Sequence, residues 1–255
     1  MLIDTHTHIY LEDFDEDRNE IINECKFHDI NQLLLPNIDS STINKLIDTC
    51  NLHPKICYPM VGLHPCSVSE NYKEELKTLK PFIEKINPIA IGEIGNDLYW
   101  DKTTLGIQKT AFIEQINWAK EFQLPIVIHA RDSYGEIFEI LDKMNDEDLF
   151  GVFHCFSSSI QEAKHILQYG GFKLGIGGVV TFKNAGLDKI LSDIPIENLV
   201  LETDSPYLTP APYRGKRNKS SYLYLIVEKL TEIYDLSAQQ IAQITSKNAK
   251  KIFKI

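Results

Sequence analysis

Leu2-Ile3-Asp4-Thr5-His6-Thr7-His8, near the amino terminus, is typical of a short apolar strand that runs directly into two histidines. Side chains alternate along an extended segment, so His6 and His8 point to one side and Thr7 points to the other. A doubly wound open sheet usually carries a glycine-rich phosphate loop after its first strand. The histidine pair at this position therefore favours a different arrangement of parallel strands.

Eight short apolar runs follow one another along the chain, and helical patterns separate them. We predict strands at 2–6, 31–37, 56–63, 88–93, 125–129, 149–154, 172–177 and 198–202. We predict helices at 15–28, 41–50, 72–86, 105–122, 134–144, 160–169, 186–192, 222–234 and 238–253. This order predicts an α/β fold, a closed (β/α)8 barrel of the TIM type, with its active site at the carboxyl ends of the strands.

The composition is that of an ordinary globular protein, with 255 residues, 43% hydrophobic and 24% charged. Because no repeat or linker interrupts the alternation, we expect a single domain over 1–255. The sequence shows no secretory signal pattern and no apolar run of 18 residues, so we expect a cytoplasmic protein without a membrane anchor. Nothing in the pattern implies an obligate protein partner.

A formal charge of −10 argues against a surface that holds nucleic acid by non-specific counterion release. A substrate that bears phosphate must therefore be attracted locally. Bound divalent cations and a few well-placed basic side chains are the means that an otherwise acidic molecule has for this.

Side chains of the metal-ligand type lie at or just beyond the ends of the predicted strands. They are His6, His8, Glu93, His129, His154 and Asp204. A carboxylate shared by two cations lowers the repulsion between them, and Glu93, flanked by glycines, suits that position. We therefore predict two divalent cations per chain. Their identity stays open between zinc, manganese and magnesium, because imidazoles favour the first two whereas magnesium prefers oxygen ligands.

Catalytic roles are predicted for Asp204, Glu93 and His64. Asp204 is suited to bind a cation and accept a proton from the attacking water. His64, after the third predicted strand, is expected to contact substrate rather than metal. Arg131 and Arg214 are predicted to bind substrate, since the planar guanidinium matches phosphate oxygens. Four aromatic residues could also stack on bases at this mouth, namely Tyr99, Trp100, Tyr207 and Tyr213.

Ordered motifs extend over nearly the whole chain. They include Asp4-Thr5-His6-Thr7-His8, Gly62-Leu63-His64-Pro65, Ile91-Gly92-Glu93-Ile94-Gly95, Pro125-Ile126-Val127-Ile128-His129-Ala130-Arg131, Phe153-His154-Cys155-Phe156-Ser157, Leu201-Glu202-Thr203-Asp204-Ser205-Pro206 and Pro212-Tyr213-Arg214-Gly215-Lys216-Arg217-Asn218. In this order they resemble the TatD family of metal-dependent deoxyribonucleases, a branch of the amidohydrolase-like barrels.

The resemblance implies a (β/α)8 barrel with two bound metals. One would lie on His6, His8, Glu93 and Asp204, and the other on Glu93, His129 and His154. Two departures from the family pattern fall in loops near the mouth. The family usually has Gly-Leu-Asp-Tyr after the bridging Glu, where this chain has Gly95-Asn96-Asp97-Leu98, and a Pro common after the Arg-Gly-x-x-Asn loop is replaced around 219–221.

The principal hypothesis is a deoxyribonuclease that cleaves phosphodiester bonds in DNA, bound transiently as substrate, from single-stranded ends with a metal-activated water. The alternative is a metal-dependent amide or ester hydrolase for a small molecule or an aminoacyl adduct, because the same water and metals would attack a carbonyl carbon. Glu93 stands where some amidohydrolases carry a carboxylated lysine, which disfavours that alternative. A non-catalytic barrel is disfavoured because the full set of candidate ligands is present.

Overall fold

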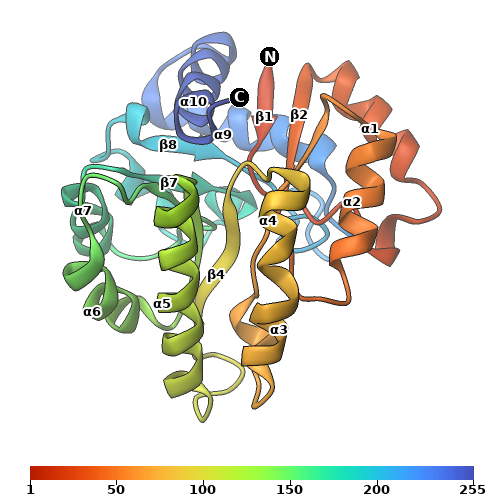
Figure 1. The fold of residues 1–255 in the computed structure, drawn as a ribbon. Coiled ribbons are helices and arrows are strands. Elements are labelled where there is room, and N and C mark those ends of the chain that lie inside the picture. The colour runs from red at the N-terminus through yellow and green to blue at the C-terminus, as the bar shows by residue number, and fades with distance from the viewer.

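Eight parallel strands alternate with helices along residues 1–255, all of which the computed structural model describes (Figure 1). The strands are β1 (Leu2–Asp4), β2 (Ile30–Leu35), β3 (Cys57–Pro59), β4 (Ile91–Asp97), β5 (Ile126–Arg131), β6 (Gly151–Phe153), β7 (Phe172–Ile176) and β8 (Leu199–Leu201). The helices are α1 (Arg18–Phe27), α2 (Ile43–Leu52), α3 (Tyr72–Leu79), α4 (Pro81–Ile86), α5 (Leu105–Phe122), α6 (Tyr134–Met144), α7 (Ile160–Gln168), α8 (Leu187–Leu191), α9 (Leu223–Tyr234) and α10 (Ala238–Phe253).

The strands form two ladders, β1-β2-β3 and β4-β5-β6-β7-β8, and backbone hydrogen bonds join the ladders at both seams. Between β3 and β4, the Val61 amide donates to Ala90 and the Gly92 amide donates to Val61, at 3.2 and 3.0 Å. Between β8 and β1, the Thr5 amide donates to the Leu201 carbonyl at 2.9 Å. The sheet is therefore closed, and the predicted (β/α)8 barrel is confirmed.

Two apolar layers stabilise the barrel. The larger contains 52 buried residues and fills the space between the strands and the surrounding helices. The smaller lies inside the barrel, where residues such as Ile3, Val127 and Val200 meet Ile252 and Phe253 of α10. The last helix thus closes the floor of the barrel, and Figure 1 shows both chain termini beside it. Polar side chains are left for the opposite end, where the strands terminate.

The predicted end of the fourth strand at Glu93 is wrong. β4 begins at Ile91 and continues to Asp97, pairing through Gly95, Asn96 and Asp97 with β5. Gly95 makes this possible because it adopts a φ of +137°, and a Cβ there would lie 2.1 Å from the His129 carbonyl oxygen. The extension brings Asp97 to the carboxyl end of the strand.

The predicted helix at 72–86 is two helices, α3 and α4, which meet at Lys80. Pro81 lacks the N–H that would continue the first helix, and it occupies the first position of the second, where that N–H is not needed. The strand predicted at 56–63 is also shorter, since β3 covers only Cys57–Pro59 and His64 follows in the connecting loop. No helix of the structure has the length and apolar character that a membrane span requires.

Gly62→Ala is expected to lower the free energy of unfolding by about 1–3 kcal/mol, because the added methyl group would push the backbones of residues 62 and 92 apart. The added Cβ would lie 2.7 Å from the Gly92 carbonyl carbon, at the seam between β3 and β4. The matched control is Gly106→Ala in α5, where an added Cβ meets nothing within 4 Å. That change should raise stability by about 0.5 kcal/mol. Equal chemical denaturation midpoints for the two variants would contradict this account of the seam.

Candidate metal centre

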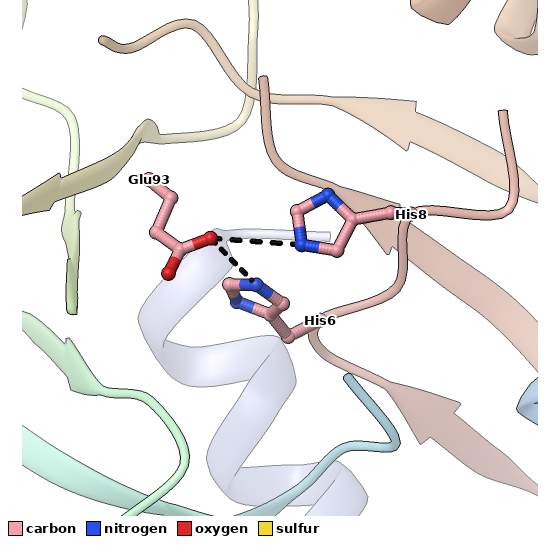
Figure 2. Close-up of side chains that lie close together, drawn as sticks. All are labelled: His6, His8 and Glu93. Atoms are coloured by element: carbon pink, nitrogen blue, oxygen red, sulfur yellow. Dashed lines mark hydrogen bonds and ion pairs between the residues drawn. The ribbon is translucent and has the colours of Figure 1, made fainter. Parts of the chain in front are cut away.

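The six candidate ligands come from five different strand ends and converge on one buried carboxylate. Glu93 lies within β4 and is 2% exposed, and its two oxygens face different groups of imidazoles. Figure 2 shows His6 and His8, from the segment after β1, directed at the same oxygen of Glu93. The closed barrel therefore brings together residues that are far apart in the sequence.

The first group surrounds Glu93 Oε2. His6 Nε2 lies 3.1 Å and His8 Nε2 lies 3.6 Å from this oxygen. Asp204 Oδ1 lies 3.7 Å from His6 Nε2 and 3.6 Å from His8 Nε2. Ligands about 2.1 Å from a tetrahedral cation stand about 3.4 Å from one another. Four of the separations among these donor atoms, from 3.1 to 3.7 Å, are close to that value, so the group is suited to one divalent cation.

The second group surrounds Glu93 Oε1. His129 Nδ1 and His154 Nε2 each lie 2.7 Å from this oxygen, and the two nitrogens are 3.3 Å apart. Glu93 thus presents one oxygen to each group of histidines. A carboxylate shared by two cations presents its oxygens in this way. The 2.7 Å separations are hydrogen-bond distances, so these donors would spread to about 3.4 Å to hold an ion.

Tyr10 fixes the tautomer of His8. The Tyr10 hydroxyl donates its only proton to the Pro36 carbonyl at 2.7 Å, so it accepts from His8 Nδ1 at 3.2 Å. His8 Nδ1 therefore carries the ring proton, and His8 Nε2 presents a lone pair toward the carboxylates. Burial and the nearby His154 charge lower the pKa of His6, which favours the neutral ring that a metal ligand needs.

Asp97 orients His129 from the other side. His129 Nε2 donates to Asp97 Oδ2 at 2.9 Å, while His129 Nδ1 faces the Glu93 carboxylate. A neutral imidazole has one N–H, so a neutral His129 would set a lone pair against the Glu93 oxygen. A bound cation that accepted both lone pairs would remove this repulsion. In its absence the ring would need a second proton.

The Asp97 carboxylate is itself held as an anion. Burial alone would raise the pKa of Asp97, but the hydrogen bond and charge of His129, with two backbone amides, lower it to about 2. Burial likewise opposes ionisation of Glu93, but the charges of His154 and His64 and the hydrogen bond from His129 hold its pKa well below the usual range. Both carboxylates therefore remain acceptors at neutral pH.

Glu202 lies behind His154. Its Oε1 is 3.5 Å from His154 Nδ1 and accepts the Cys155 amide, and the side chain is fully buried. Gly175 leaves the space for it, since a Cβ there would lie 2.3 Å from Glu202 Oε2. Glu202 is therefore placed to orient His154, because it faces the ring nitrogen that points away from Glu93.

His64 is held in the opposite tautomer. Its Nδ1 accepts the Cys66 amide at 3.0 Å, so the ring proton of the neutral form is on Nε2. His64 Nε2 lies 3.3 Å from Glu93 Oε1 and donates toward it. His64 therefore presents a hydrogen-bond donor to the mouth, whereas His8 presents a lone pair.

The family model for TatD-related DNases matches residues 3–254. The chain belongs to the TatD-related DNase family. It is 38% identical, over the full length of both chains, to the metal-dependent hydrolase YabD of Bacillus subtilis. It is 32% identical to the metal-dependent hydrolase YcfH of Escherichia coli K12, over 76% of this chain and 72% of YcfH.

Solved structures agree with this assignment. The crystal structure of YjjV, a TatD homologue of Escherichia coli K12, superposes with a TM-score of 0.93 at 26% identity, covering 100% of this chain and 98% of YjjV. A TatD-family hydrolase of Entamoeba histolytica shares the fold at 20% identity, with a TM-score of 0.82 over 98% of this chain and 97% of the other. This TatD-family chain is accordingly a metal-dependent hydrolase.

The two arginines predicted to bind substrate lie in different surroundings. The guanidinium carbon of Arg131 is 3.8 Å from the ring centroid of Tyr99, on the rim beside His129. The guanidinium carbon of Arg214 is 3.8 Å from the ring centroid of Phe182, and its Nη1 donates to the Thr209 carbonyl. Arg131 thus lies on the metal side of the mouth, whereas Arg214 contacts Thr209 of its own loop and Phe182 of the loop between β7 and α8.

Sequence reasoning missed Tyr10 and Asp97 as partners of the histidines. The sequence offers a clue to both, because each lies an even number of residues beyond a predicted ligand and so on the same side of an extended segment. Tyr10 is two residues beyond His8, and Asp97 is four beyond Glu93. The predicted strand ends at Glu93, four residues before Asp97, so Asp97 is expected in a loop rather than beside the histidines.

Tyr10→Phe is expected to weaken divalent-metal affinity about 10-fold, because His8 loses the acceptor that fixes its tautomer. Competition against a chromophoric chelator measures this directly. Tyr234→Phe is the matched control, since it also removes a hydroxyl that hydrogen-bonds to backbone, lying 2.9 Å from the Leu191 and Ile194 carbonyl oxygens between which it shares its proton. Unchanged affinity in the first variant, or equal losses in both, would contradict the role of Tyr10.

Proposed function

We propose that this protein is a deoxyribonuclease that hydrolyses phosphodiester bonds from single-stranded DNA ends. The observation that carries the proposal is the division of the Glu93 carboxylate between two groups of donor atoms, with Oε2 facing His6 and His8 and Oε1 facing His129 and His154. Paired cation sites of this kind are typical of enzymes that displace an oxygen at phosphorus.

His6, His8, Glu93 and Asp204 would hold one cation, and Glu93, His129 and His154 would hold the other. When bound, the pair supplies an acidified water and positive charge beside the phosphoryl oxygens. Four imidazoles among the ligands favour zinc or manganese over magnesium. Glu93 keeps both groups of histidines at a fixed separation and balances the charge between them.

Asp204 is assigned the proton-accepting role. Its side chain is 13% exposed, whereas those of His6 and Glu93 are 0% and 3% exposed, so Asp204 is the member of its group that water can reach. Burial opposes its ionisation, but contacts with His8 and the charges of His154 and His6 keep its pKa below the usual value. An ionised carboxylate at this place can orient an incoming water and take its proton.

His64 and Arg131 are assigned to the phosphate. The Nε2–H of His64 is directed into the site and can donate to a non-bridging oxygen as charge develops there. Arg131 supplies a fixed positive charge on the rim, which matters in a chain of net charge −10. Because the site lies at the mouth of a barrel, a loose strand end reaches it more easily than the middle of a duplex.

Glu93→Gln is expected to lower cleavage of end-labelled single-stranded DNA by about 10³-fold or more, because an amide cannot serve both cations. The amount of bound divalent metal, measured by inductively coupled plasma mass spectrometry, should also fall below two ions per chain. Glu121→Gln is the matched control, since that carboxylate is on the surface and pairs only with Lys80. Wild-type rates in Glu93→Gln would contradict the assignment.

Chelation and readdition of metal, with DNA and carbonyl substrates in parallel, test which kind of bond the protein hydrolyses. Chelated protein is expected to lose DNA cleavage and to regain it on addition of zinc, manganese or magnesium, assayed singly. Parallel assays use amide and ester substrates with the same preparations. One result would contradict the nuclease assignment: wild type cleaves DNA with none of the metals but turns over an amide or ester, and Glu93→Gln abolishes that turnover. The function would then be amide or ester hydrolysis.

A further inference from the structure

The loop between β4 and α5 exposes two adjacent aromatic side chains beside the metal centre. Tyr99 is 54% exposed and Trp100 is 71% exposed, whereas Trp118, the other tryptophan of the chain, is 1% exposed. Neighbouring aromatic rings left in water at the rim of a site are typical of surfaces that bind a ligand. The metal chemistry assigned above makes no use of either ring.

Arg131 joins the two rings into one surface. The Tyr99 and Trp100 rings are perpendicular, with centroids 5.0 Å apart. The Arg131 guanidinium carbon lies 3.8 Å from the Tyr99 centroid and 5.6 Å from the Trp100 centroid. Arg131 therefore covers one face of Tyr99 and sets a positive charge beside Trp100, which keeps most of its surface in solvent.

Asp97 connects this surface to the metal centre. Its Oδ1 accepts the backbone amides of Tyr99 and Trp100, at 2.9 and 3.2 Å, while its Oδ2 accepts from His129 Nε2. Gln108 of α5 also holds this turn, since its Oε1 accepts a hydrogen bond from the Asp97 amide and its Nε2 donates one to the Asp97 carbonyl. The aromatic pair is thus fixed in place before any substrate arrives.

A nucleobase is the ligand that this surface fits. Aromatic side chains and guanidinium planes bind bases by stacking, and stacking is tolerant of sequence because every base has a π-face. The adjacent charge suits the phosphate that each base carries. A base inside a duplex has both faces covered by its neighbours, so an unpaired base offers a face for stacking far more readily.

We propose that Tyr99, Trp100 and Arg131 form a stacking subsite for the unpaired base next to the scissile phosphate. The subsite would select single-stranded over double-stranded nucleic acid without reading its sequence. This inference rests on the proposed nuclease function, because it takes the substrate of the metal centre to be a nucleic acid.

Trp100→Ala is expected to weaken the binding of a fluorescein-labelled single-stranded oligonucleotide by about 10-fold in the metal-loaded protein. The oligonucleotide carries phosphorothioate linkages that slow hydrolysis, so anisotropy reports binding alone. Trp100→Phe should restore most of the affinity because it keeps a ring. Phe27→Ala is the matched control: its side chain is 86% exposed at the end of α1, which leads into β2 at the other end of the barrel. It should bind like wild type.

Intrinsic fluorescence gives a second readout that a purely structural effect would not produce. Because Trp118 is buried, quenching by a stacked base should come from Trp100 and disappear in Trp100→Phe. An oligonucleotide whose terminal nucleotides lack bases should quench little, and it should bind wild type and Trp100→Ala equally. On a cleavable substrate, Trp100→Ala should raise KM about 10-fold and leave kcat nearly unchanged.

Wild-type affinity in Trp100→Ala, or equal binding of the abasic and normal oligonucleotides by wild type, would overturn the subsite. Its failure is distinct from a failure of the nuclease assignment. If wild type cleaves DNA while Trp100→Ala keeps its affinity and KM, only the subsite is wrong. If wild type binds and quenches as described but cleaves no oligonucleotide under any metal, the subsite stands and the nuclease assignment is wrong.

Discussion

The structure depends on one buried anion that nitrogen donors face from two sides. Burying a carboxylate is unfavourable unless positive charge or hydrogen bonds compensate it. At Glu93 the neighbours are imidazoles, and in their neutral forms His8 and His129, with the tautomers that Tyr10 and Asp97 favour, would turn lone pairs toward the carboxylates. Two divalent cations would resolve this conflict, since each would accept lone pairs from nitrogen and oxygen together. The rest of the barrel holds the donors in the positions where such ions fit.

Three of the four candidate histidine ligands contact a side chain outside the group, whereas the buried Nδ1 of His6 has no hydrogen-bond partner. Tyr10, Asp97 and Glu202 each contact the ring nitrogen of a histidine that faces away from the centre. Such partners orient a ligand and raise its basicity. Asp97 does more, because it also accepts the amides of Tyr99 and Trp100. One carboxylate therefore fixes both a candidate metal ligand and the rim that would meet the substrate.

The order of strands and the barrel could be predicted from the sequence, because apolar runs and amphipathic patterns reflect burial directly. The helices at 105–122, 134–144 and 238–253 have the predicted bounds. The sequence could not show where β4 ends, since Gly95 is as typical of a loop as of a close approach between strands. Pro81 carried a usable signal for the break between α3 and α4. The tautomers could not be predicted, because the hydrogen bond that sets His8 ends at Pro36, on another strand end.

The central claim is that Glu93 lies between two cations, and anomalous diffraction tests it most directly. Crystals of the protein loaded with zinc or manganese, measured on either side of the absorption edge of that element, locate each of these ions without reference to activity. The account predicts two peaks, one among His6, His8, Glu93 and Asp204 and one among Glu93, His129 and His154. An ordered site with a single peak or with no peak would contradict it.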